Sequence, residues 1–167
     1  MLRKLFSWPW LRVWITAGLT AAAVEMLFVL PIQKHFGVTP AQLFQSIAMG
    51  ALGPAAFQAG LYSVLLGVAV HILISLASAL LFAAAMLRIA VVRRHYLIAG
   101  ILYGVVVFAV MSLVVLPLSA IGFAPPKTIG LFLTSLSVHL FAFGLPIGLV
   151  CGRGLPRIPV PPEVARP

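Results

Sequence analysis

Long runs of apolar residues dominate the chain, without the two-residue alternation of a half-buried strand. No Asp, Glu, Lys or Arg occurs within residues 35–87, 95–126 or 128–152. A helix that crosses a hydrocarbon core of about 30 Å needs about 20 mostly apolar residues. Four segments meet this requirement, and we predict membrane-spanning helices over residues 13–33, 60–87, 97–118 and 129–151.

The apolar stretch between the first two predicted spans carries its own helix signals. Thr39 can accept a hydrogen bond as an N-cap, Pro40 suits the first helical position, and Gln42 completes a capping box. Gly53 and Pro54 should end or bend this helix. We expect a short amphipathic helix that lies on the outer leaflet, with a re-entrant segment lining a cavity as the alternative.

The composition places this pattern in a membrane. Hydrophobic residues make up 63% of the 167 residues and charged residues 8%, with a mean hydropathy of +1.19. A soluble core of this size cannot bury so much apolar surface. We therefore predict an all-α, polytopic membrane protein: a four-helix transmembrane bundle with one short amphipathic helix on the outer side. Residues 1–152 would form the membrane domain, and the proline-rich residues 153–167 a disordered cytoplasmic tail.

Basic residues flank the predicted spans unequally. Only Lys34 and Lys127 lie on one side, whereas the other nine of the 11 basic residues lie on the opposite side. These nine are Arg3, Lys4, Arg12, Arg88, Arg93, Arg94, Arg153, Arg157 and Arg166. Cytoplasmic loops carry the excess of Lys and Arg, so both termini are expected in the cytoplasm. Membrane lipids are the expected partners and nucleic acid is not, because three short basic segments lack an aromatic platform between them.

The N-terminal segment could also be a signal peptide, since it pairs basic residues with an apolar run. However, Trp8, Trp10 and Trp14 surround Arg12, which is typical of an anchor at the membrane interface. We therefore expect the segment to be retained as the start of the first span.

Glycines recur at four-residue spacing in two of the spans. Gly100 and Gly104 form one such pair, and Gly144 and Gly148 form another, which Gly152 extends. Helices in lipid gain little from hydrophobicity, so small residues that permit close approach matter more. These glycines are predicted to be helix-packing faces, with self-association of the protein as a further option.

Three titratable side chains fall at similar depth inside the predicted spans. Glu25 is the only acidic residue in a span, while His71 and His139 lie in the second and fourth. Such residues are costly in lipid and usually face the bundle interior. Serines share the helical faces of the histidines: Ser75 and Ser78 with His71, and Ser135 with His139. We predict that these six residues form one intramembrane polar layer.

This layer has three possible uses. One is a metal site, since Glu and His bind zinc or iron, although no HxxH pair fixes two ligands on one helix. A second is a proton or cation relay through Glu25 and the histidines. The third, which we favour, is a hydrogen-bonded cluster that sets helix register. No GxSxG, GxxxxGK or paired-carboxylate motif is present, so we expect neither enzymatic activity nor a cofactor.

Several of these positions form a familiar set. They are Glu25 and Pro31 in the first span, His71 in the second, Gly100, Gly104 and Pro117 in the third, and His139 in the fourth. In these positions the chain resembles the YagU-like family of bacterial inner-membrane proteins. The segment QSIAMGALG at residues 45–53 is similar to segments of other bacterial membrane proteins. The resemblance implies a bacterial cytoplasmic membrane and no particular activity.

From these patterns we expect a bacterial inner-membrane component with a structural or accessory role. The alternative function is a small proton- or cation-coupled transporter or channel that uses Glu25, His71 and His139.

Overall fold

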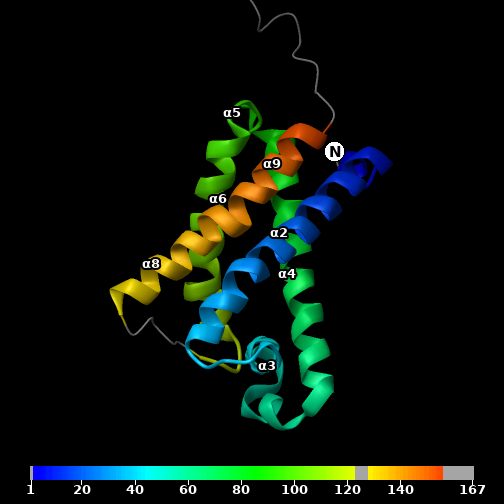
Figure 1. Cartoon of the computed structure of the whole chain (residues 1–167). Coiled ribbons are helices and arrows are strands. Elements are labelled where there is room, and N and C mark those ends of the chain that lie inside the picture. Colours follow the sequence, from blue (N-terminus) through cyan, green and yellow to red (C-terminus); the bar gives the residue numbers. More distant parts are fainter. Residues whose placement is uncertain (1, 123–127, 156–167) are drawn as a thin grey trace, which may run out of the picture.

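The computed structural model describes residues 2–122 and 128–155, and these residues form helices joined by short turns, with no strand (Figure 1). Most of the chain is α-helical, η1 is a 3-10 helix, and η2 and η3 are π-helical. The elements are α1 (Leu2–Leu5), α2 (Trp8–His35), α3 (Pro40–Leu52), η1 (Gly53–Gln58), α4 (Gly60–Arg88), α5 (Ala90–Arg94), α6 (Tyr96–Val110), η2 (Met111–Val115), α7 (Leu116–Leu118), α8 (Ile129–Ser137), η3 (Val138–Gly144) and α9 (Leu145–Gly154).

Four helices of this part of the chain are long and apolar enough to cross a membrane. They are Trp8–His35, Gly60–Arg88, Tyr96–Leu118 and Ile129–Gly154. The prediction of an all-α bundle with four apolar spans is thus confirmed. The class that this fold defines is a multi-pass helical membrane protein.

Two of the predicted boundaries are wrong by a few residues. The first span begins five residues before residue 13, because Pro9 lies in the first turn, where its missing N–H leaves no helical bond unmade. The last span ends at Gly154 and so takes in the first two residues of the predicted tail. The rest of that predicted tail, apart from Leu155, lies outside the described residues, as does Lys127.

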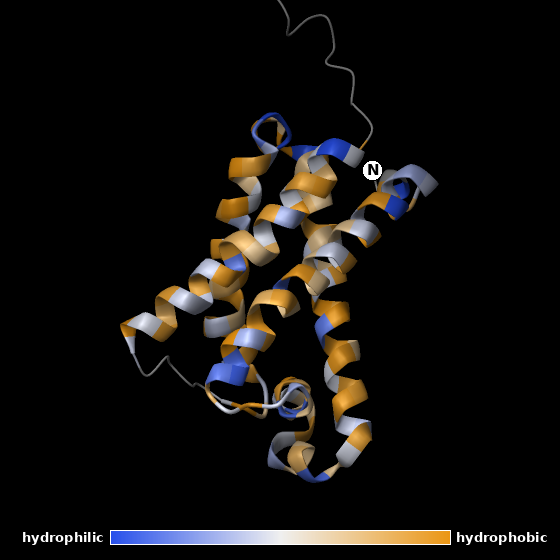
Figure 2. Cartoon of the chain, in the orientation of Figure 1, coloured by the Kyte–Doolittle hydropathy of each residue, from blue (hydrophilic) through white to orange (hydrophobic). Residues whose placement is uncertain are grey.

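The surface of the spans is apolar, as contact with lipid requires. Leu65, Leu73, Leu81 and Phe141 all expose more than half of their area. Figure 2 shows hydrophobic residues along the spans and hydrophilic residues gathered at α5 and at the end of α9. Packing between helices therefore has to come from a narrow set of inward-facing residues.

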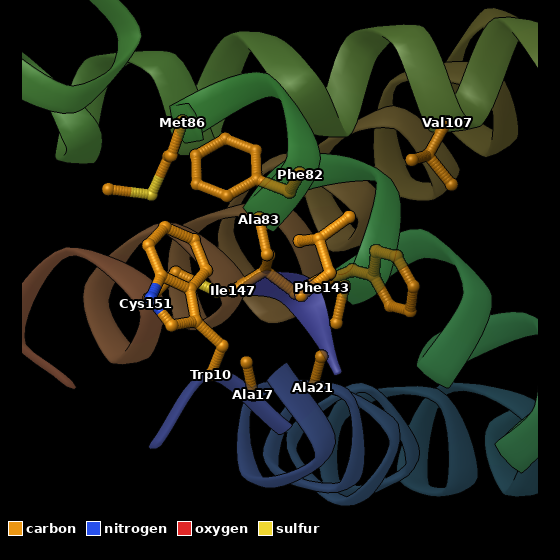
Figure 3. Packing of buried hydrophobic residues seen from close by; sticks show 12 residues of the cluster. Trp10, Ala17, Ala21, Phe82, Ala83, Met86, Val107, Phe143, Ile147 and Cys151 are labelled. Carbon is orange, nitrogen blue, oxygen red and sulfur yellow. The ribbon is translucent and has the colours of Figure 1, made fainter. Parts of the chain in front are cut away.

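Small residues make up much of the buried core (Figure 3). Alanines of α2 and α4 share one cluster with larger side chains of α4 and the fourth span. Helices α2 and α4 approach closely at Gly18, where an added Cβ would lie 2.9 Å from Leu76 Cα. The core residues are Leu5, Trp10, Ala17, Ala21, Ala79, Phe82, Ala83, Met86, Val107, Phe143, Ile147 and Cys151. Trp10 belongs to this core, so its side chain faces inward and not toward lipid. Trp8 does remain exposed, and the Arg12 guanidinium lies 5.8 Å from the centre of its ring.

The capping box at the start of α3 is present as predicted. The Gln42 backbone N–H donates to Thr39 Oγ1 at 3.2 Å, and the Thr39 N–H donates to Gln42 Oε1 at 2.9 Å. The helix packs against α4, where Gly67 lies directly beneath the backbone of Phe44. Gly67 is seven residues into α4, or about 10 Å at 1.5 Å per residue. Helix α3 therefore packs along the side of α4, about two turns from the start of that span.

Candidate polar site between the spans

Glu25 of α2 and His71 of α4 face each other inside the bundle. Glu25 Oε2 lies 4.0 Å from His71 Nδ1, and each side chain is 12% exposed. The other ring nitrogen, His71 Nε2, lies 3.2 Å from the backbone oxygen of Ala22. A carbonyl oxygen only accepts hydrogen bonds, so Nε2 carries a proton and Nδ1 is left to face the carboxyl group.

With Nε2 protonated, one further proton can be placed on either member of the pair. The proton can reside on Glu25, which then faces a neutral imidazole, or on His71 Nδ1, which then forms an ion pair with the carboxylate. Both forms are electrically neutral overall, whereas loss of the proton would leave a carboxylate facing a ring lone pair. The pair is thus suited to a low-dielectric setting and to proton binding.

His139 lies in the π-helical segment η3. Its Nδ1 donates to the Ser135 carbonyl oxygen at 2.8 Å, one turn earlier in the chain. The ring stands edge-on to Phe108, with 5.4 Å between centroids. Wide π turns inside α-helices are frequent at functional sites. Both π segments here, η2 and η3, end two residues before a proline, Pro117 and Pro146.

One cavity of about 200 Å³ is lined by all three titratable side chains. Its walls are otherwise apolar apart from Ser75, and α3 closes one side through Leu43 and Ile47. At about 30 Å³ per water molecule, a few waters could fit beside the polar groups. The three side chains that we predicted at similar depth thus line the same cavity. Helix α3, which we considered as a segment lining a cavity, also lines it.

A shared metal site gains no support from the geometry. Within residues 2–122 and 128–155, no three His, Cys, Asp or Glu side chains are grouped so that they could hold a metal ion. The structure pairs Glu25 with His71, and His139 instead bonds within its own helix.

The predicted serines take different places. Ser75 lines the cavity and donates from Oγ to the His71 carbonyl at 2.8 Å. Ser78 and Ser135 lie outside the cavity lining, and each offers a backbone carbonyl: Ser78 to the Tyr103 hydroxyl at 2.9 Å, and Ser135 to His139. Tyr103 was missed by sequence reasoning, because no pattern in the chain links a tyrosine to a carbonyl on another helix.

A second cavity, of about 550 Å³ and largely apolar, adjoins the first. The two share Ile47, Ile74 and Met111 in their walls. The second runs between α4 and η2, with α3 at its end, where Gly50 O accepts from the Ala120 N–H at 3.0 Å. The polar cavity thus borders an apolar space at the α3 end of the bundle.

The predicted glycine faces meet one another within the chain. A Cβ atom added to Gly100 would lie 2.7 Å from Gly144 O and 2.8 Å from Gly148 Cα. One added to Gly104 would overlap the carbonyl of His139 and lie 2.7 Å from Leu140 Cα. These contacts set the position of the histidine-bearing helix against α6.

Comparison with known protein families, curated proteins and solved structures finds no match to this chain.

Proposed function

We propose that this protein is a non-enzymatic structural or accessory component of a bacterial inner membrane, with an internal Glu/His layer that holds its spans in register. The observation that carries the proposal is the Glu25–His71 pair, in which His71 also bonds to α2 through the Ala22 carbonyl. One side chain of α4 thus makes two polar links to α2. Among the described residues, every buried side-chain nitrogen and oxygen has a hydrogen-bond partner, as a register-setting cluster requires.

The test is the stability of two variants in detergent. Glu25→Gln and His71→Ala should each lower the free energy of unfolding by about 1–2 kcal/mol. The first removes the ion pair with His71, and the second removes both polar links of His71 to α2. Thermal unfolding followed by circular dichroism measures the loss. His35→Ala is the matched control, since that histidine is exposed at the end of α2. Equal melting temperatures for His71→Ala and His35→Ala would contradict the register role.

The orientation that we propose places both termini in the cytoplasm, from the excess of basic residues on one side. Single cysteines at Lys34 and Arg94 test it through labelling of intact cells with a membrane-impermeant reagent. The cysteine at residue 34 should react and the one at residue 94 should not. The reverse result would overturn the orientation. Membership of the YagU-like family, and with it the bacterial inner membrane, stays a prediction.

Self-association also stays a prediction. The glycine faces of α6 and α9 are already occupied by each other, so a second copy would need another surface.

A second function is favoured by one specific observation: the cavity with three titratable side chains, in which Glu25 and His71 can share a proton. Such a site suits a small proton- or cation-coupled transporter or channel. Purified protein in liposomes with an imposed pH gradient distinguishes the two functions. If the native protein dissipates the pH gradient and folded Glu25→Gln protein does not, the transport function would replace the structural one. An unchanged gradient with the native protein would rule out simple proton conduction.

A further inference from the structure

A second polar site lies at the opposite end of the bundle, where α5, the start of α2 and the end of α9 come together (Figure 1). A cleft of about 440 Å³ opens there, away from the Glu25 cavity. Two arginines line it, Arg93 of α5 and Arg153 of α9, together with Trp10, Met86, Tyr96, Gly152 and Leu155. The cleft is therefore basic and aromatic, unlike the other cavities described above.

A hydrogen bond within the protein holds the Arg93 side chain in place. It is half-buried, and its Nη1 donates to the Met86 carbonyl at 2.7 Å, near the end of α4. A guanidinium group has five N–H donors, so this bond leaves others available. The side chain is thus oriented before any ligand arrives, which reduces the entropy lost on binding.

Arg153 approaches from the last turn of α9 and is exposed. The only acidic side chain among the described residues is Glu25, which lies far along α2 from Trp10. The described part of the chain thus supplies no carboxylate to neutralise the charge in the cleft. An anion is the natural complement of these two cations.

The remaining walls suit a ligand that is not wholly polar. A Cβ atom on Gly152 would overlap the ring of Tyr96, so this ring lies directly against α9. Trp10, which is 5% exposed, forms an inner wall of the cleft, and the half-buried Tyr96 provides aromatic surface at the level where the apolar spans end. Aromatic rings at this level are typical of the membrane interface, beside the phosphates and glycerol groups of lipids.

We propose that this cleft binds the phosphate group of an anionic phospholipid. The guanidinium groups of Arg93 and Arg153 take the phosphodiester oxygens, and the glycerol and upper acyl chain lie against Trp10, Tyr96 and Leu155. Arginine suits this role because its planar fork matches two phosphate oxygens. A net negative headgroup is favoured over a zwitterionic one, because a choline group would add a third positive charge to the cleft.

Binding can be measured by native mass spectrometry of delipidated protein in a neutral detergent, with phosphatidylglycerol or phosphatidylcholine added at equal concentration. Phosphatidylglycerol should be retained in preference. Arg153→Gln should weaken its binding about fivefold, the effect expected for one arginine near an anionic headgroup. Arg93→Gln should weaken it at least as much. Arg94→Gln is the matched control, because this exposed neighbour does not line the cleft.

The decisive variant is Arg153→Gln, because Arg93 also bonds to Met86 and its loss could disturb the fold. Equal retention of the two lipids would overturn the proposal, and so would equal effects of Arg153→Gln and Arg94→Gln. Inorganic phosphate and glycerol phosphate form a further arm. If either bound as tightly as the lipid and depended on Arg153, the site would be one for a soluble phosphate, and the lipid assignment would fail.

Discussion

The two halves of the bundle are packed in different ways. In the half next to α5, which we call the basic half, alanines and glycines bring α2, α4, α6 and α9 into close contact around Phe82 and Ile147. In the half next to α3, the opposite half, α4 and η2 are separated by the 550 Å³ cavity, and the polar cavity adjoins it. The same four spans therefore pack tightly around Phe82 and Ile147, next to the Arg93–Arg153 cleft, and leave a large apolar cavity toward α3.

The difference shows that small residues and polar residues contribute differently to helix packing in lipid. Where small side chains face each other, backbones approach closely and dispersion contacts hold the helices. Toward α3, the 550 Å³ cavity separates α4 from η2, and the polar cavity with Glu25, His71 and His139 adjoins it. Stability is thus expected to come mainly from the basic half, and any binding of protons or ions from the opposite half.

The largest expected effect comes from the glycine contact between α6 and the fourth span. Gly100→Ala should lower the free energy of unfolding by about 3 kcal/mol, because the added methyl group meets the backbones of Gly144 and Gly148 and cannot be accommodated without moving a helix. Thermal unfolding in detergent measures it. Gly130→Ala is the control, since its Cβ would meet only Thr128 Oγ1, at 3.8 Å. A Gly100→Ala protein as stable as the control would mean that the packing is loose at both ends.

A smaller effect is expected where α3 meets α4. Gly67→Ala places a methyl group against the Phe44 backbone, and we expect a loss of about 1–2 kcal/mol as α3 shifts outward. Hydrogen exchange should rise in α3 and remain unchanged in α9. Gly50→Ala is the control, because its Cβ would make only ordinary contacts with Ser119 and Ile121. Equal exchange rates in the two variants would show that α3 is not held by this contact.

The smallest expected effect concerns the hydrogen bond between α6 and α4. Tyr103→Phe removes the bond to the Ser78 carbonyl and keeps the ring contact with Phe82, so we expect a loss of about 1 kcal/mol. Tyr62→Phe, at an exposed tyrosine, is the control. If the melting temperatures of both variants matched that of the native protein, close packing alone would account for the basic half.

Some elements of the structure could be predicted from the amino-acid sequence and others could not. The long uncharged runs predicted four spans, and Thr39 with Gln42 predicted the start of α3, because span length and capping depend on local residues. The depth of Glu25, His71 and His139 along their helices predicted that they lie in one layer. The π segments, the Tyr103–Ser78 bond and the burial of Trp10 were not predicted, because each depends on a neighbouring helix.

Local patterns along the chain specify the apolar helices, the ends of those helices to within a few residues, and the basic end of the bundle. These properties follow from hydropathy, capping and charge, which act over one or two turns. The tertiary structure alone decided that Glu25 pairs with His71 and not with His139, and that Arg93 and Arg153 share a cleft. The rotation and separation of whole helices decide such contacts, and these depend on every residue along the packed faces.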